Sequence, residues 1–164
     1  LYSLCYSCGQ KDRAIRYLRS YVSDKPSDPQ GLYNLADGIR RERHFEEALE
    51  QYRAAIECGF SDISLAKLKM ADIQQQINRE NEAIVILEEI LNEEPTYLPA
   101  LFNLASLYDE IADKQHACEL YQKILAIQPD HALAMSRLAT MSGNAIESER
   151  LILKIKSCIL LWVS

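Results

Sequence analysis

The residues of this chain that could do chemistry are its five cysteines and three histidines. Cys5 and Cys8 have the two-residue gap of a metal-binding or redox pair. A structural zinc site needs four ligands, however, and no two of the remaining cysteines and histidines are spaced as a second pair. A thioredoxin-like site would need a βαβ context, which the sequence lacks. We therefore expect no metal, and we interpret the scattered cysteines as reduced thiols, which favours a cytoplasmic location.

Catalytic signatures are also missing from the sequence. It contains no G-x-S-x-G nucleophile elbow, no phosphate-binding glycine loop and no H-E-x-x-H zinc motif. His44, His116 and His131 have no Cys or Ser nucleophile at a meaningful spacing. Acidic pairs such as Glu88-Glu89 are typical of solvated helix faces. We predict that this chain is not an enzyme and binds no cofactor.

Composition narrows the class of partner. The chain has 164 residues and a net charge of −6, the opposite sign from most proteins that bind nucleic acid or anionic membranes. Hydrophobic residues make up 48% and charged residues 26%, which argues for a folded chain rather than a disordered one. No apolar run reaches about 18 residues, so we expect no membrane insertion. The first residue is Leu1, which we interpret as the start of a fragment or of a processed product.

Several residue types recur along the chain at nearly constant spacing. A small residue stands at Ala14, Ala48, Ala83 and Ala117, at spacings of 34, 35 and 34. Large apolar residues recur in the same way at Leu1, Leu35, Met70, Leu104 and Leu138. Aromatic or leucine side chains repeat at Leu18, Tyr52, Leu87 and Tyr121. Every series has its one extra residue in the same interval, between Phe60 and Met70, so the chain is built from internal repeats.

This pattern resembles the tetratricopeptide repeat family. The clearest repeat, 98–131, carries the family's Leu-Ala pair, a Tyr four residues after that Leu, the small residue of the second helix and a closing proline. These residues are Leu104, Ala105, Tyr108, Ala117 and Pro129. The resemblance implies an all-α fold, a right-handed α-solenoid of antiparallel helix pairs. Small side chains at Ala105 and Ala117 would let the two helices of a pair approach closely.

The repeat register divides the chain into units. We predict complete repeats at 29–63, 64–97 and 98–131, a partial repeat at 1–28, and a further first helix plus a capping helix at 132–164. The apolar periodicity predicts helices at 10–24, 29–42, 45–58, 62–77, 80–93, 96–111, 114–127 and 130–142. Stacking of neighbouring pairs would supply the core, because one pair cannot bury its own apolar face.

The sequence departs from the family pattern at three places, where we expect locally looser packing. Tyr2 stands where a small residue is usual, and Gln74 stands at an aromatic position. Residues 58–60 read Cys-Gly-Phe where Asp-Pro is usual. None of these departures breaks the repeat register.

In the tetratricopeptide repeat family, the first helices line a concave groove that binds peptides. At equal repeat positions these helices carry Asn34, Lys69, Asn103 and Arg137, which we call the polar ladder. Asn can donate to and accept from a peptide backbone, whereas Lys and Arg only donate. Neighbouring positions complete the predicted peptide-binding groove with Tyr33, Asp37, Asp72, Phe102, Ser106 and Thr140.

The family's carboxylate clamp, which holds acidic C-terminal tails, is poorly matched. Asn103 and Arg137 fit it, but Leu68, Asp72 and Leu133 replace the other three groups. Because Asp37, Asp72 and Asp109 would oppose a purely acidic ligand, we expect a neutral or mixed-charge segment.

The predicted function is protein–protein interaction, with a protein or peptide partner and no nucleic acid. One alternative is a substrate-docking segment of a larger glycosyl-, sulfo- or methyltransferase. Another is self-association through the apolar C-terminal helix, because Cys158–Val163 would need a cover.

Overall fold

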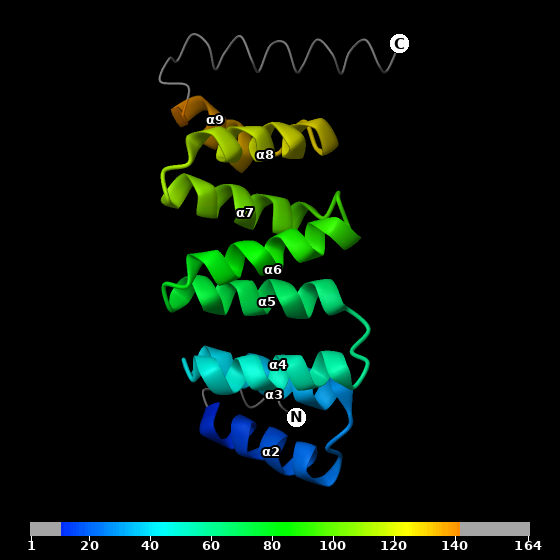
Figure 1. Cartoon of the computed structure of the whole chain (residues 1–164). Helices are drawn as coiled ribbons and strands as arrows, with labels where there is room; N and C mark the ends of the chain where they lie inside the picture. The colour runs from blue at the N-terminus through cyan, green and yellow to red at the C-terminus, as the bar shows by residue number, and fades with distance from the viewer. Residues whose placement is uncertain (1–10, 142–164) are drawn as a thin grey trace. The chain divides into compact units, whose positions relative to one another are not determined.

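The computed structural model describes residues 11–141, and all regular structure within that range is helical (Figure 1). The helices are α2 (Lys11–Asp24), α3 (Pro29–Arg41), α4 (Phe45–Glu57), α5 (Ile63–Gln76), α6 (Glu80–Glu93), α7 (Leu98–Glu110), α8 (Lys114–Ile127) and α9 (Ala132–Met141). Each bound lies within two residues of its predicted position. The predictions for Tyr2, Cys5, Cys8 and the apolar segment Cys158–Val163 concern residues outside the described range.

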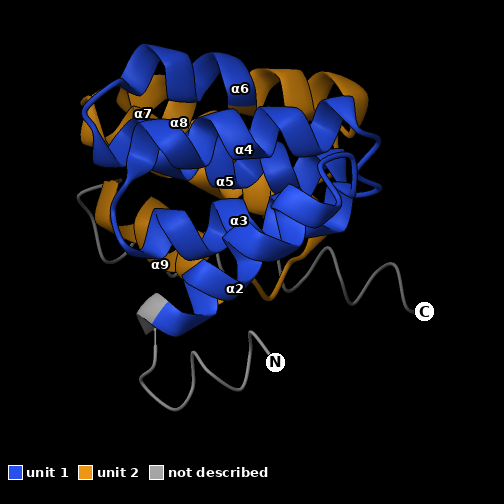
Figure 2. Cartoon of the chain, turned by 90° about the horizontal axis from the view of Figure 1, so that it is seen from below, with its two compact units in different colours: residues 1–86 blue, residues 87–164 orange. Residues whose placement is uncertain are grey.

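The chain divides into two compact units, Leu1–Ile86 and Leu87–Ser164 (Figure 2). We call them unit 1 and unit 2; their boundary falls inside α6. In unit 1, α2 packs on α3, α3 on α4, and α4 on α5. In unit 2, α7 packs on α8 and α8 on α9. Because short loops join these helices, neighbours in each unit are antiparallel, and alternate helices run in the same direction.

Aspartates begin three of the helices. The residue before α3, α5 and α8 is Asp28, Asp62 and Asp113, respectively. Each carboxylate accepts a hydrogen bond from the backbone N–H three residues later, at 3.0, 2.9 and 3.2 Å. Such a cap satisfies an N–H that has no partner inside the helix and contributes about 1 kcal/mol.

The turns that end α3, α5 and α7 share one geometry. In each turn a residue has a positive φ: Arg43 at 64°, Asn78 at 56° and Ala112 at 64°. The residue after it donates its N–H to a carbonyl five positions back, as Asp113 does to Tyr108 at 2.8 Å. This is the Schellman motif, which commonly places glycine at the left-handed position. Two of the three turns therefore hold a side chain in a conformation that disfavours it.

Replacing Ala112 by glycine should stabilise unit 2 by about 0.5–1 kcal/mol. The left-handed conformation costs an alanine about 1–2 kcal/mol, and the extra freedom of glycine in the unfolded chain offsets part of the gain. Ala112 is exposed, so no packing is lost. Urea unfolding would measure the change, with Asn78→Gly as the matched control, because asparagine already tolerates this conformation. Equal midpoints for Ala112→Gly and the wild type would contradict the prediction.

The small residues of the repeat pattern lie at helix contacts, as predicted. The side chains of Ala36, Ala48, Ala71, Ala83, Ala105 and Ala117 are fully buried. In unit 1, Ala36 and Ala48 belong to one apolar cluster, formed where α3 packs on α4. In unit 2, Ala105 and Ala117 occupy the same place between α7 and α8. Close helix approach therefore depends on these alanines in both units.

The Cys-Gly-Phe departure tightens the structure, contrary to the expected loosening. Gly59 has a φ of 88°, which a glycine adopts without strain, and it ends α4 in the same type of turn. The N–H of Phe60 then donates to the carbonyl of Ala55 at 2.9 Å. The buried Phe60 ring stacks on Tyr33, with centroids 4.4 Å apart and planes 5° apart. Phe60 is thus buried at a repeat position where Pro26 and Pro95 are exposed.

The departure at Gln74 is of a different kind. Its side chain is buried on α5, and its Oε1 atom has no hydrogen-bond partner among the described residues. A buried polar atom without a partner is unfavourable by about 1–3 kcal/mol. Here the expected local weakness agrees with the structure.

Candidate peptide-binding surface

The predicted groove residues of unit 1 lie on α3 and α5. Tyr33, Asn34 and Asp37 are half-buried on α3, between the buried core positions of that helix. Lys69 and Asp72 are half-buried on α5. Residues three apart share one face of a helix, so Asn34 lies beside Asp37 and Lys69 beside Asp72. The side chains of these residues are therefore placed at the rim of the core, where they can meet both solvent and the neighbouring helix.

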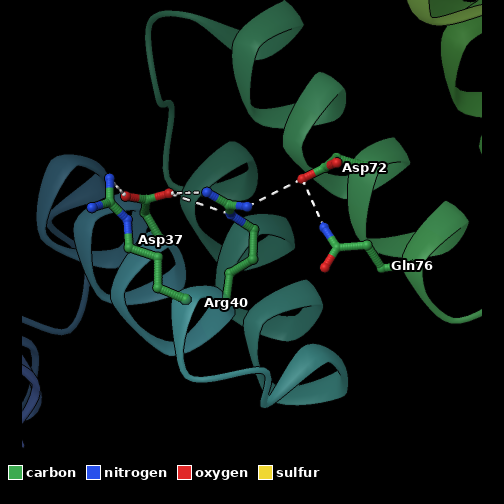
Figure 3. A network of polar contacts seen from close by, with 5 residues as sticks. Asp37, Arg40, Asp72 and Gln76 are labelled. Carbon is green, nitrogen blue, oxygen red and sulfur yellow. Dashed lines mark hydrogen bonds and ion pairs between the residues drawn. The ribbon is translucent and has the colours of Figure 1, made fainter.

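A single arginine joins the two helices (Figure 3). Arg40, on α3, donates from Nε and Nη2 to Oδ1 of Asp37, at 3.3 and 2.9 Å. Its Nη1 donates to Oδ2 of Asp72 on α5, at 3.1 Å. Arg41 pairs with the other Asp37 oxygen at 2.9 Å, and Gln76 donates to Asp72 Oδ2 at 3.1 Å. Asp37 and Asp72 are thus held by cations of the chain itself.

This network changes the expectation drawn from the aspartates. The sequence predicts that Asp37 and Asp72 repel an acidic ligand, but Arg40 and Arg41 together place two positive charges beside these two carboxylates. The Arg40 and Asp37 side chains are only 18% and 16% exposed, so water screens this pair less than a surface pair. The side chains that remain for a ligand are those without such partners. Sequence reasoning missed Arg40, although its position one turn after Asp37 is a recognisable signal.

Two ladder residues have polar groups left for a ligand in unit 1. Asn34 uses its Oδ1 to accept a hydrogen bond from Gln30 at 3.1 Å, which leaves its amide N–H groups. Lys69 forms no hydrogen bond or ion pair with any residue that the structure describes.

Aromatic packing fixes Tyr33 between two helices. Besides stacking on Phe60, its ring meets Tyr52 edge to face, with centroids 5.5 Å apart. Tyr52 is fully buried on α4, and its hydroxyl has no hydrogen-bond partner among residues 11–141. Burial, and after it the Asp37 carboxylate, raises the pKa of Tyr52 well above that of an ordinary tyrosine. Arg40 lies close enough to act against this rise in pKa, but its N–H groups are directed at the aspartates.

Unit 2 carries its own set of predicted groove residues on α7. Phe102, Asn103 and Ser106 are half-buried there. The Phe102 ring contacts Tyr121 edge to face at 6.0 Å and His131 at 5.5 Å. Ser106 Oγ lies 3.3 Å from the Tyr121 hydroxyl, so these two groups share a hydrogen bond. Asn103 has no hydrogen-bond partner within the described part of the chain.

The last two predicted residues lie on α9. Arg137 and Thr140 are exposed. Nη1 of Arg137 donates to Oδ2 of Asp109 on α7, at 3.5 Å, so α7 and α9 are joined by a charge pair as α3 and α5 are. Thr140 donates to the backbone carbonyl of Arg137 at 2.7 Å, which occupies its proton. The structure thus brings together predicted groove residues from two alternate helices in each unit: α3 and α5 in unit 1, and α7 and α9 in unit 2.

Two of the histidines have local structural roles. Nδ1 of His131 accepts from the N–H of Ala134 at 3.2 Å, at the start of α9. His116 pairs with Asp113 at 2.7 Å, and this hydrogen bond lowers the pKa of the Asp113 carboxyl. Within residues 11–141, no group of three or more metal-ligating side chains comes together.

Comparison with protein families identifies two repeats. Residues 98–131 and 65–97 each match a family described as tetratricopeptide repeat. The chain is 23% identical over 144 residues to the ycf37 protein of Guillardia theta, of which it covers 81%. It is 25% identical over 151 residues to the human protein O-mannosyl-transferase TMTC3, and 25% identical over 136 residues to the tetratricopeptide repeat-containing protein trd-1 of Caenorhabditis elegans. It spans only 16% and 17% of these two proteins.

Solved structures share the fold. A MamA crystal structure superposes with a TM-score of 0.78 at 19% identity, covering 96% of this chain and 93% of that chain. A tetratricopeptide repeat protein from Parabacteroides merdae superposes with a TM-score of 0.77 at 23% identity, covering 96% of this chain and 64% of that chain. The fold is therefore an all-α solenoid. None of the helices described is long and apolar enough to span a bilayer. The repeat register, the paired helices and the two matching repeats together show that residues 65–131 of this chain are tetratricopeptide repeats.

Proposed function

We propose that this chain binds an extended or helical peptide segment of a partner protein in a concave groove lined by its first helices. Tetratricopeptide repeats form protein-interaction scaffolds. What we add is the location of the binding site, in the groove of this chain. The site comprises the polar ladder together with Tyr33, Asp37, Asp72, Phe102, Ser106 and Thr140. The repeat units are those predicted above, and the chain itself performs no catalysis.

The proposal rests on the observation that two side chains of the polar ladder have no polar partner among the described residues. Asn103 in unit 2 and Lys69 in unit 1 stand at equal repeat positions on first helices, and neither has a polar partner in the described part of the chain. Asn103 and Lys69 are half-buried, so part of each residue remains accessible to a ligand.

Replacing Asn103 by alanine should weaken binding of a selected peptide about five- to tenfold. The amide can both donate to and accept from a peptide backbone, and each such bond contributes about 0.5–1.5 kcal/mol. A 12-residue random peptide library would be selected on the immobilised chain. Fluorescence anisotropy would then measure the Kd of an enriched peptide for each variant.

Asn92→Ala is the matched control, because Asn92 is an exposed asparagine on α6 outside the proposed site. The Asn92 variant should bind like the wild type, and both variants should melt at the same temperature. Equal Kd values for Asn103→Ala and Asn92→Ala would remove the groove from this proposal.

A second candidate function has one observation in its favour. The likeness to human protein O-mannosyl-transferase TMTC3 covers 92% of this chain but 16% of that protein. We therefore also consider that the chain is the substrate-docking segment of a larger transferase. The complete coding sequence would decide between the two: a catalytic domain beside these repeats would favour docking. Asn103→Ala should then raise the KM for a protein substrate and leave kcat unchanged.

We place the protein in a reducing, cytoplasmic setting. The support is that Cys58 and Cys118, the cysteines within the described range, are both free thiols. Self-association through the C-terminal helix concerns residues outside that range and stays a prediction.

A further inference from the structure

The residues that precede the first helices stand at equal repeat positions, and one of them is a histidine. Asp28 and Asp62 cap α3 and α5, and the next two positions in this series are Tyr97 and His131. We infer that His131 is a pH-sensitive cap of α9, which holds the start of this helix at neutral pH and releases it when the ring takes up a proton. This switch acts on α9 itself, so it goes beyond the proposed function and needs no ligand for its test.

The His131 ring caps α9 through a nitrogen atom that can be protonated. Its Nδ1 accepts a hydrogen bond from the N–H of Ala134, three residues later, at 3.2 Å. Asp28 and Asp62 accept the equivalent bond with a carboxylate oxygen. Because a backbone N–H can only donate, Nδ1 must hold a lone pair, and the neutral ring carries its proton on Nε2. The cap therefore exists only while His131 is neutral.

Protonation of His131 is unfavourable for the start of α9 in two ways. An imidazolium carries a proton on both nitrogens, so Nδ1 can no longer accept, and the Ala134 N–H loses its partner. The new positive charge also lies at the N-terminus of the helix, which is the positive end of the helix dipole. The stability that the cap gives α9 is therefore fully present above the pH range in which histidines titrate, and it falls as the pH drops through that range.

A neighbouring aromatic ring opposes this effect. The Phe102 ring on α7 lies 5.5 Å from the His131 ring, between centroids, and a charged imidazolium would be attracted to its face. Loss of a cap changes the opening equilibrium of a helix about fivefold, and the unfavourable charge at the dipole adds about two- to fivefold. The contact with Phe102 offsets about two- to fivefold of this change. The lost cap therefore decides the direction, and α9 should open about fivefold more readily when His131 is charged.

The other titratable and charged groups around His131 do not share its pH range. Because α8 runs antiparallel to α7 and α9, the start of α9 lies at the level of the start of α7 and the end of α8. The groups at this level, together with the nearest one along α9, are Tyr97, Tyr121, Lys123, Asp130 and Arg137. Side chains of these types ordinarily keep one charge state between about pH 5 and about pH 7.5. The other histidine of unit 2, His116, lies at the opposite end of α8 and pairs with Asp113.

Amide hydrogen exchange on the whole chain would measure the opening of α9. Protection factors of a peptide covering 132–141 would be compared at about pH 7.5 and about pH 5, because these factors exclude the intrinsic pH dependence of exchange. We expect the wild-type factor to fall about three- to fivefold at the lower pH. His131→Asn should show no such fall, because asparagine caps a helix and does not titrate. The matched control, His116→Asn, should behave like the wild type.

The inference holds only if the fall is present in the wild type and in His116→Asn and absent in His131→Asn. An unchanged or raised factor in the wild type would mean that the contact with Phe102 outweighs the lost cap, and would overturn the inference. An equal fall in the wild type and His131→Asn would assign the effect to another group, and its loss in His116→Asn would assign it to His116. Circular dichroism would show that each variant is folded. His131→Asp, which restores the residue type of Asp28 and Asp62, answers the same question if His131→Asn does not fold.

Discussion

Replacing Ala117 by leucine is expected to destabilise unit 2 by about 1–3 kcal/mol. Ala117 is fully buried on α8, in the cluster that also contains Ala105 of α7. Three extra carbon atoms at this contact must force the two helices apart or push side chains out of their preferred rotamers. Ala105→Leu should have a similar effect, because it enlarges the other side of the same contact. Urea unfolding, followed by circular dichroism, would measure the loss.

Ala126→Leu is the control for this result. Ala126 lies on the same helix but is exposed, and leucine forms helices nearly as well as alanine. The control should therefore unfold at the wild-type midpoint. If Ala117→Leu also unfolds at that midpoint, close approach of α7 and α8 does not depend on a small residue here.

Removing the hydroxyl of a buried tyrosine should stabilise unit 1 but destabilise unit 2, although the two tyrosines stand at equal repeat positions. Tyr52 and Tyr121 are both fully buried on second helices, but only Tyr121 has a hydrogen bond, to Ser106. Tyr52→Phe removes a buried hydroxyl without a partner and should stabilise unit 1 by about 1 kcal/mol. Tyr121→Phe breaks a hydrogen bond and should destabilise unit 2 by about 0.5–1.5 kcal/mol.

Amide hydrogen exchange would measure both effects, since it reports the local free energy of opening. Peptides from α4 should exchange more slowly in Tyr52→Phe, and peptides from α8 should exchange faster in Tyr121→Phe. Faster exchange of α4 in Tyr52→Phe would mean that its hydroxyl has a favourable interaction with the Asp37–Arg40 pair that exceeds its cost of burial.

The position that faces these two tyrosines shows how one residue type changes a repeat. Asp37 and Ser106 stand at equal repeat positions on first helices. In unit 2 the small serine hydroxyl reaches the Tyr121 hydroxyl. In unit 1 the aspartate instead turns its oxygens to Arg40 and Arg41, and the Tyr52 hydroxyl is left without a partner. The charge network of α3 and α5 is therefore formed at the expense of a buried hydrogen bond.

Much of this fold could be predicted from the sequence alone. Helix periodicity, the recurring alanines and the aspartates before α3, α5 and α8 are local signals, each acting within a few residues along the chain. Periodicity and repeat register placed each bound of the described helices within two residues of its position, and the recurring alanines identified the close contacts; the capping aspartates were not used in that prediction. Repetition strengthened these signals, because the same pattern occurs in successive units.

The groove was only partly predictable. Sequence register placed Asn34 and Lys69 on first helices of unit 1, and Asn103 and Arg137 on first helices of unit 2. That all four line one groove stays a prediction. The repeat register could not predict which side chains pair with each other. Arg40, for example, pairs with Asp72, which lies 32 residues away on a different helix.

The sequence by itself determined the helices, their ends and the family, because these depend on periodicity and on neighbours in the chain. Only the tertiary structure decided which polar groups remain for a ligand. Arg40 could have pointed to solvent, but the packing of α3, α4 and α5 brings Asp72 within 3.1 Å of its guanidinium. The same packing lays Phe60 on Tyr33. Such contacts depend on the relative placement of separate helices and on side-chain rotamers, which no spacing of residues along a chain specifies.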